Sequence, residues 1–172
     1  MSPRPDTAPA PQLDPVDGLV QLSFVIMGLL ERRAAEHDLS IAATRLLGVL
    51  RDRTPTMNEL ARYLDLDKSS VTGLIDRAQR RGLVVRVPST TDRRAVLVSL
   101  TDHGRSLASG GAARFEADIS LLLQRLPSAD RDALSGLIGR LLVAHAADHG
   151  TDLSATINTG NPGPEPHSVR SS

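Results

Sequence analysis

The sequence predicts a mainly α-helical protein with a small β-hairpin wing, in the element order α-α-α-α-β-β-α-α. Three observations carry this prediction. Apolar residues recur at the i, i+3, i+4 spacing of an amphipathic helix in several separate segments. Two β-branched runs, residues 83–87 and 95–100, flank a polar turn and indicate a hairpin. Two short helices, capped by Thr56 and Asp67, lead directly into that hairpin.

The first predicted helix, from about Val16 to His37, is apolar around most of its circumference. Its apolar residues are Leu19, Val20, Leu22, Phe24, Val25, Ile26, Met27, Leu29 and Leu30. A helix of this kind must be buried on more than one side. One domain of this size offers a single core, so we expect a second copy of the chain to cover the remaining side. Ser40 then caps a second helix, about Ile41–Arg53.

The third and fourth helices form the centre of the prediction. Thr56 and Glu59 make the T-x-x-E capping box that begins the third helix, and Asp67 caps the fourth after a short turn. Gly82 is expected to end the fourth helix in the left-handed conformation. Two short helices followed by a hairpin are the order of a winged helix-turn-helix, a structure that reads DNA.

The chain is predicted to hold one domain between two disordered tails. The tails are rich in Pro or Gly, a composition that cannot bury enough apolar surface to fold. Thr101 caps a long fifth helix to about Leu126, and Pro127 separates it from a sixth. The predicted parts are a tail at 1–15, a domain at 16–149 with its winged helix-turn-helix at about 41–100 and dimerisation helices at about 16–37 and 101–148, and a tail at 150–172.

Charge is distributed unevenly along the chain. The formal net charge of the 172 residues is zero. Residues 51–94, however, hold ten Lys and Arg against six Asp and Glu, a local charge of +4. A basic patch attracts phosphate even on a neutral protein, because salt confines its field to about 10 Å.

The sequence offers no complete set of candidate residues for several classes of function, among them catalysis, redox sensing and metal binding. The chain has no cysteine, which excludes thiolate catalysis and thiol-based redox sensing. His145 and His149 stand one helical turn apart, but no third metal ligand is obvious. We therefore expect no enzyme, no catalytic residues, no cofactor and no metal. The apolar run Leu19–Leu30 is shorter than the roughly 20 residues of a membrane span, so we expect a cytoplasmic protein without a membrane partner.

The fourth helix carries the predicted DNA-reading face. One side holds apolar residues at helical spacing, so the opposite side presents hydroxyls, a glycine and basic residues. Short side chains let a helix lie close to base edges, and a helix N-terminus beside a lysine favours phosphate. An ordinary solvated surface is the alternative reading. The predicted contact residues are Lys68, Ser69, Ser70, Thr72, Gly73 and Arg77.

The hairpin turn supplies a second predicted contact. A guanidinium on a protruding turn suits a narrow, electronegative minor groove, although a solvated charge run is the alternative. The predicted wing contacts are Thr90, Thr91, Arg93 and Arg94. Asp92 would repel phosphate, so we expect it to support an arginine by an ion pair. Asp76 of the fourth helix is a second candidate support for a wing arginine, with simple exposure as its alternative.

These motifs resemble those of the MarR family of winged-helix bacterial regulators. The resemblance is strongest over about residues 56–104. It implies a homodimer built from the terminal helices, one recognition helix per subunit in the major groove, and wings in the minor groove. In many members it also implies a ligand pocket between the dimerisation helices and the DNA-binding lobe. The residues that carry it are Leu60-Ala-Arg-Tyr-Leu, Lys68-Ser-Ser-Val-Thr-Gly-Leu-Ile-Asp-Arg77, Arg81-Gly-Leu-Val, Asp92-Arg93-Arg94, and Val98-Ser-Leu-Thr101 with Gly104.

The sequence thus predicts a DNA-binding transcription regulator and repressor that binds double-stranded DNA, at a pseudo-palindromic operator, as a homodimer. Some members of the family sense oxidants through cysteine, which this chain lacks. Any signal is expected to be a small molecule, in an aliphatic pocket walled by the first, second and fifth helices. Whether an effector exists stays open. The alternative is a winged-helix protein interaction module that does not bind specific DNA.

Overall fold

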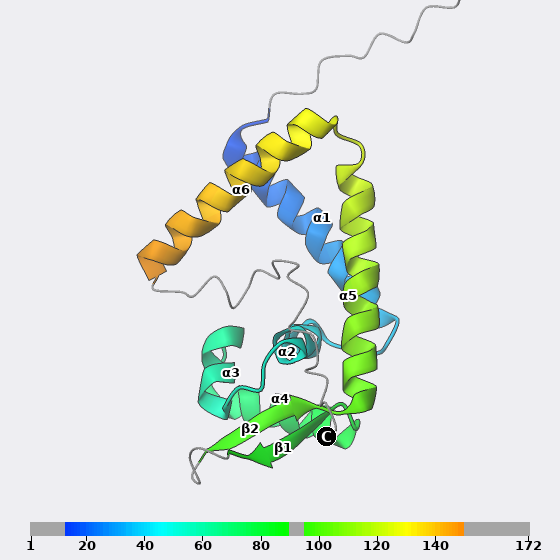
Figure 1. The fold of residues 1–172 in the computed structure, drawn as a ribbon, viewed down its shortest axis with the longest axis vertical. Helices are drawn as coiled ribbons and strands as arrows, with labels where there is room; N and C mark the ends of the chain where they lie inside the picture. Colours follow the sequence, from blue (N-terminus) through cyan, green and yellow to red (C-terminus); the bar gives the residue numbers. More distant parts are fainter. Residues whose placement is uncertain (1–12, 90–94, 150–172) are drawn as a thin grey trace, which may run out of the picture.

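The computed structural model describes residues 13–89 and 95–149 and confirms the predicted element order (Figure 1). Six helices and a two-stranded antiparallel hairpin make up the described part of the chain. The elements are α1 (Pro15–Ala35), α2 (Ile41–Arg51), α3 (Met57–Leu64), α4 (Lys68–Arg80), β1 (Val84–Pro88), β2 (Val96–Leu100), α5 (Asp102–Leu123) and α6 (Ser128–His149).

Side-chain caps fix where the central helices begin. The Thr56 backbone N–H donates to Glu59 Oε2 at 2.7 Å, and the Glu59 N–H donates to Thr56 Oγ1 at 3.3 Å, so both halves of the capping box are present. Asp67 caps α4, and its Oδ1 accepts from the Ser70 N–H at 2.9 Å. Gly82 follows α4 with φ +66°, the left-handed conformation predicted for it.

Three helices end earlier than predicted. The chain leaves α1 at Ala35, because Asp38 adopts a left-handed φ of 52° and turns it toward α2. The second helix ends at Arg51, since Pro55 disfavours helical conformation in the residue before it. The fifth helix ends at Leu123, three residues before the predicted end, and a short turn leads into α6. These are the small shifts expected at helix ends, where the last turn is readily distorted.

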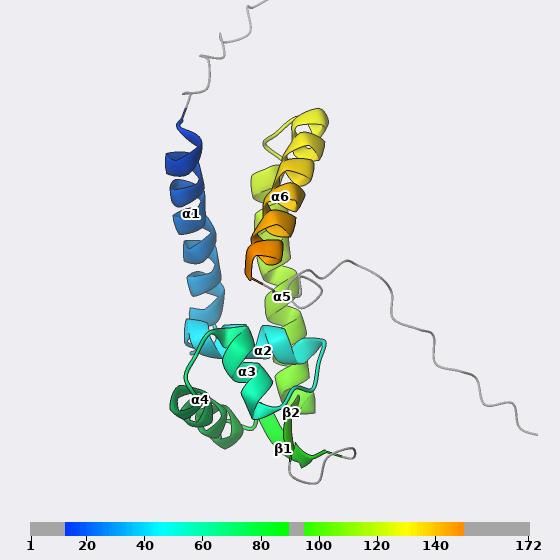
Figure 2. The same cartoon turned by 90° about the vertical axis from the view of Figure 1, so that its left-hand side faces the viewer.

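The helices divide into a compact lobe and a long helical arm. In Figure 1, α2, α3, α4 and the hairpin gather in the lower part, and α5 rises from the hairpin along one edge. Figure 2 shows α1 standing on one side above the lobe, with α5 and α6 on the other. The lobe is the winged helix-turn-helix, and the arm consists of α1, α5 and α6.

The hydrophobic core lies in the lobe. Its fully buried side chains come from α2, α3, α4, both strands and the residue directly before β1, so the two short helices and the hairpin share a single core. They are Leu46, Leu60, Leu64, Val71, Ile75, Leu83, Val84 and Val98. No helix in residues 13–89 and 95–149 is long and apolar enough to cross a membrane.

The junction between α4, β1 and α5 is tightly packed. The Thr101 hydroxyl donates to the carbonyl of Gly82 at 2.6 Å, and its oxygen accepts from the Gly104 N–H at 2.9 Å. A Cβ at Gly104 would lie 1.9 Å from the carbonyl oxygen of Leu83, so only glycine fits there. The start of α5 is thereby held against the end of α4, which fixes the lobe to the arm.

Candidate nucleic-acid interface

The fourth helix has one buried and one exposed face, as its sequence predicts. Val71, Leu74, Ile75 and Ala78 are buried in the lobe. The residues that were predicted to read DNA lie on the other side, where all are exposed except Gly73, which is half-buried. The exposed ones are Lys68, Ser69, Ser70, Thr72 and Arg77.

The three hydroxyl groups on this face all donate their protons to acceptors at the start of α4. Ser69 Oγ donates to Asp67 Oδ1 at 2.5 Å, and Ser70 Oγ donates to Asp67 Oδ2 at 2.6 Å. Thr72 Oγ1 donates to the Lys68 carbonyl at 2.8 Å. The serine hydroxyls hold the pKa of the Asp67 carboxyl well below its usual range, so it stays ionised. Each hydroxyl oxygen therefore offers lone pairs outward and can accept from the amino group of adenine or cytosine.

Gly73 makes room for the guanidinium of Arg77. A Cβ on Gly73 would lie 3.3 Å from Arg77 Nη1, so the arginine folds back along the helix over the glycine. A larger residue at this position would displace that guanidinium. The pairing explains why a glycine is useful in the middle of a helix, where it otherwise weakens the helix by about 1 kcal/mol.

An ion pair joins the hairpin to α4. Arg86 of β1 donates from Nη2 to Asp76 Oδ1 at 2.6 Å and from Nη1 to Gln79 Oε1 at 2.5 Å. This is the geometry that the wing-support hypothesis for Asp76 requires, although the role itself stays a proposal. Sequence reasoning missed Arg86 as the partner. The alternation of side chains along a strand could have identified Arg86, because it places Arg86 on the same face of β1 as Val84, which is buried in the lobe.

The turn of the hairpin lies outside the described residues. Thr90, Thr91, Asp92, Arg93 and Arg94, which the sequence predicts to contact DNA or to support the wing, fall in this segment. Their roles stay predictions. The strands on either side are paired in regular antiparallel register from Val84 with Leu100 to Pro88 with Val96.

Two helices of the arm expose apolar faces. Along α1 the exposed side chains include Leu19, Val20, Phe24 and Val25. The last helix, α6, exposes a second set, consisting of Leu137, Ile138, Leu141, Leu142 and Val143. Contiguous apolar surfaces of this kind mark interaction sites in soluble proteins.

The comparisons with known proteins agree with this geometry. A family model described as "MarR family" matches residues 37–95. The regulator PecS of Dickeya dadantii is 26% identical over 142 residues, which cover 80% of this chain and 85% of PecS. The structure of apo wild-type MarR from E. coli is 25% identical, with a TM-score of 0.65 over 76% of this chain and 98% of that one. Residues 37–95 of the chain therefore match the MarR family.

The MarR relatives are transcription regulators rather than enzymes. A further one, the transcriptional activatory protein BadR of Rhodopseudomonas palustris, is 33% identical over 89 residues. That alignment covers 52% of this chain and 42% of BadR, and the chain spans about half the length of such relatives. The described residues that the family resemblance singled out lie on α3, α4, the two strands and the start of α5, or in the short turn between α4 and β1.

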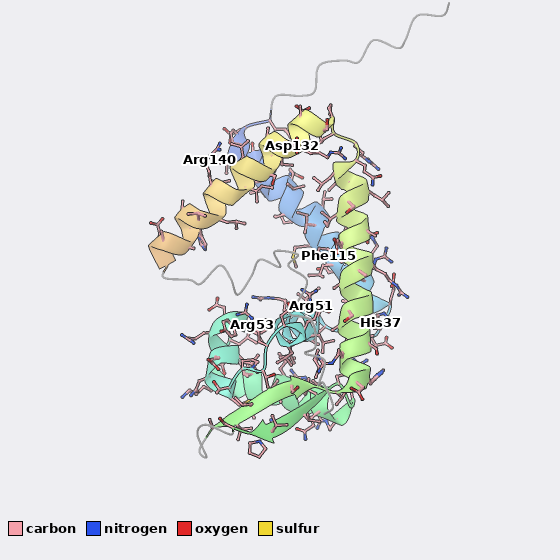
Figure 3. The ribbon with its side chains drawn as sticks, viewed as in Figure 1. His37, Arg51, Arg53, Phe115, Asp132 and Arg140 are labelled. Atoms are coloured by element: carbon pink, nitrogen blue, oxygen red, sulfur yellow. The ribbon has the colours of Figure 1, made fainter. Side chains whose placement is uncertain are left out.

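The lobe meets the arm at a cavity of about 210 Å³ between α1, α2 and α5. Figure 3 labels Phe115 of α5 and Arg51 of α2 near the place where the three helices meet. The predicted pocket walls were these same three helices. The apolar lining includes Leu30, Ala34, Leu39, Leu47, Leu107, Ala108 and Phe115, and the polar lining is Arg33, His37, Thr44 and Arg51.

Arg33 of the cavity wall is held by two carboxylates. Its Nε and Nη2 donate to the two oxygens of Asp118 on α5, each at 2.7 Å, and its Nη1 donates to Glu36 at 2.6 Å. Asp118 and Glu36 raise the pKa of Arg33, and the guanidinium in turn lowers the pKa of both carboxyls. This network ties α1 to α5 beside the cavity.

Proposed function

We propose that the protein is a sequence-specific DNA-binding transcription regulator that reads a short pseudo-palindromic operator as a homodimer. One observation carries the proposal. The fourth helix buries its apolar stripe and turns short hydroxyls, Lys68 and Arg77 outward, and Arg86 holds the hairpin against it. A helix with small polar residues fits the major groove, and a basic hairpin turn suits the minor groove.

The outward residues divide into two roles. Phosphate contacts set the position and most of the affinity, whereas contacts with base edges set the sequence preference. Because Ser69 and Ser70 already donate their hydroxyl protons to Asp67, they can only accept from DNA and therefore favour bases that carry an amino group. The Thr72 methyl group can contact the methyl group of thymine. The proposed phosphate contacts are Lys68, Arg77, Arg93 and Arg94, and the proposed base contacts are Ser69, Ser70, Thr72 and Arg77.

The exposed apolar faces of α1 and α6 support the homodimer. A second copy would remove these side chains from water, and each buried leucine would contribute about 1.5–3 kcal/mol. A two-fold dimer presents two recognition helices to half-sites about one helical turn, or roughly 10 bp, apart. In sedimentation experiments Leu141→Glu on α6 should shift the protein toward monomer. Ser135→Glu, which adds the same charge at a polar exposed position of that helix, should leave the dimer intact.

The cavity supports release of DNA by a small molecule. It lies where the lobe joins the arm, and the backbone carbonyl of His37, which lines it, accepts from Arg81 at the carboxyl end of α4. A ligand there changes DNA affinity only if it binds the DNA-free geometry more tightly. We infer a repressor that occupies its operator until such a ligand binds.

Selection of binding sites from random duplexes tests the central part of this function. The proposal predicts an inverted repeat with half-sites about 10 bp apart, enriched in adenine or cytosine amino groups facing the N-terminal part of α4. A Ser69→Ala, Ser70→Ala double variant should relax the preference at those positions only. Recovery of no consensus by the wild-type protein would favour a winged-helix module that binds another protein.

A further inference from the structure

The cavity between α1, α2 and α5 has the size of one small molecule. Its volume is about 210 Å³, and most of its wall is aliphatic or aromatic. An apolar cavity of about 150 Å³ stays dry and accepts benzene, so this one has room for a single ring with a short substituent. Gly48 and Gly111 also line it, and a Cβ at either position would meet no atom within 4 Å.

The strongest charge in the wall is already neutralised. Every nitrogen of the Arg33 guanidinium donates to a carboxylate, through the bidentate pair with Asp118 and the bond to Glu36. Three of its five N–H groups are used in this way, so an incoming carboxylate could reach the other two only beside the negative charges of Asp118 and Glu36. Arg114 also donates to Glu36, at 3.1 Å, but it lies outside the cavity lining. The site therefore offers an anion little attraction.

Two further polar groups of the wall are also engaged. Arg51 donates from Nε and Nη2 to the carboxylate of its neighbour Asp52, which keeps a negative charge beside it. The Thr44 hydroxyl donates to the carbonyl of Ser40 at 3.1 Å. The charge of Arg51 is thus already paired, and the Thr44 hydroxyl can only accept from a ligand while it keeps its bond to Ser40.

His37 is different from the other polar residues of the wall. Among the described residues, its ring is the one polar side chain of the lining that makes no hydrogen bond to protein. An imidazole has one nitrogen that donates and one that accepts when neutral, so it pairs equally well with a hydroxyl or a carbonyl. It supplies a directional contact in a site whose wall is mostly apolar.

We propose that the cavity binds a small, uncharged, mostly apolar molecule whose one hydroxyl or carbonyl group bonds to His37, and that it discriminates against carboxylates. This rests on the proposed effector function and names the class of effector. The discrimination follows from the carboxylates around Arg33, since a second anion would be desolvated beside them without a free cation to pair with.

Calorimetric titration of the full chain with benzyl alcohol, toluene and benzoate at about pH 7.5 tests the proposal. Each probe has one benzene ring, which carries a neutral polar group in benzyl alcohol, an apolar group in toluene and an anionic group in benzoate. Benzyl alcohol should bind at least about tenfold more tightly than benzoate, and several-fold more tightly than toluene. Benzoate binding as tightly as the alcohol would overturn the proposal and leave a ligand-responsive regulator standing.

Two variants locate the cause of the preference. His37→Leu should abolish the advantage of benzyl alcohol over toluene without weakening toluene. Glu36→Gln should strengthen benzoate binding several-fold, because it frees part of the Arg33 charge. Glu31→Gln, an equal charge change on an exposed residue of α1 outside the lining, should not. Equal benzoate affinities for the two glutamine variants would contradict the role of the Arg33 network, and circular dichroism checks that each variant is folded.

DNA release separates this proposal from the function on which it rests. Benzyl alcohol that binds in the predicted order but leaves DNA affinity unchanged would support the ligand class and refute the effector role. If none of the three probes bound, the proposed ligand class and the effector role of this cavity would both be refuted, because the probes match the cavity in size and polarity.

Discussion

Arg81, the C-cap residue of α4, joins the end of that helix to the wall of the cavity at His37. Its Nη2 donates to the His37 carbonyl at 2.8 Å, and its Nη1 donates to the Asp38 carbonyl at 2.6 Å. The same His37 lines the cavity between α1, α2 and α5. A ligand that moves this turn therefore moves two of the hydrogen bonds that hold the carboxyl end of α4. These two hydrogen bonds connect the cavity to α4 in the proposed regulation, and one substitution of Arg81 would remove both.

Replacement of Arg81 by Met should uncouple the cavity from the DNA-reading face. The methionine keeps the apolar stem but removes both donors. Amide hydrogen exchange in the last turn of α4 should become faster, and the factor by which benzyl alcohol weakens DNA binding should fall toward one. Arg105→Met, at an exposed position of α5, serves as the control. An unchanged factor in Arg81→Met would show that the coupling runs elsewhere.

The Asp76–Arg86 pair should matter more for DNA binding than for stability. Both side chains are partly exposed, so loss of the pair should cost less than about 1 kcal/mol of unfolding free energy. Arg86→Met should nevertheless weaken operator binding several-fold, because the hairpin loses its attachment to α4. Asp76→Asn should have a similar effect, and the double variant should lose no more than Arg86→Met alone. Additive losses in DNA affinity would mean that the two residues act independently.

Arg93 should behave as a phosphate contact at the turn of the hairpin. Arg93→Ala should weaken binding to all duplexes to a similar extent and should reduce the slope of log affinity against log salt by about one unit. Titrations at several salt concentrations measure this slope. Arg105→Ala, which removes an exposed arginine of α5 outside the predicted contacts, is the control and should leave the slope unchanged. A changed sequence preference with an unchanged slope would assign Arg93 to base contact instead.

The Arg33–Asp118 pair should make stability depend on pH in the acid range. The pair lowers the pKa of Asp118 in the folded state, so the folded protein binds fewer protons than the unfolded chain near that pKa. Its contribution is complete above the ordinary pKa of about 4 and is lost as the pH falls through the lower folded value. Wild type should thus exceed Asp118→Asn in unfolding free energy at pH 7 and 5, and the difference should shrink below about pH 4. Asp132→Asn on α6 is the control, and a difference that persists unchanged at pH 3 would contradict the account.

Much of this fold could be predicted because its signals are local. The Thr56 and Glu59 capping box, the Asp67 cap and Gly82 each act within a few residues, so the sequence alone locates both central helices. The apolar excess of α1 indicated an uncovered face, which the exposed Leu19 and Phe24 now show. Helix periodicity also separated the buried and exposed sides of α4.

The remaining features depend on contacts between segments that are far apart in the chain. Arg86 meets Asp76 ten residues away, and Arg33 meets Asp118 across 85 residues, so neither partner follows from local pattern. The sequence could suggest which helices wall the cavity but not that the charge of Arg33 is already neutralised. The direction of the serine hydroxyls also became apparent only from the cap geometry of Asp67.

Fluorescence anisotropy of the purified protein with the duplex upstream of its own gene tests the central claim most directly. A scrambled duplex of the same composition is the control, at about 150 mM salt, and Arg77→Ala is titrated beside wild type. The account predicts that wild type binds the upstream duplex at least about 10³-fold more tightly than the scrambled one, and that Arg77→Ala loses most of this preference. Equal affinity of wild type for both duplexes, and for every duplex recovered by selection, would contradict a sequence-specific regulator.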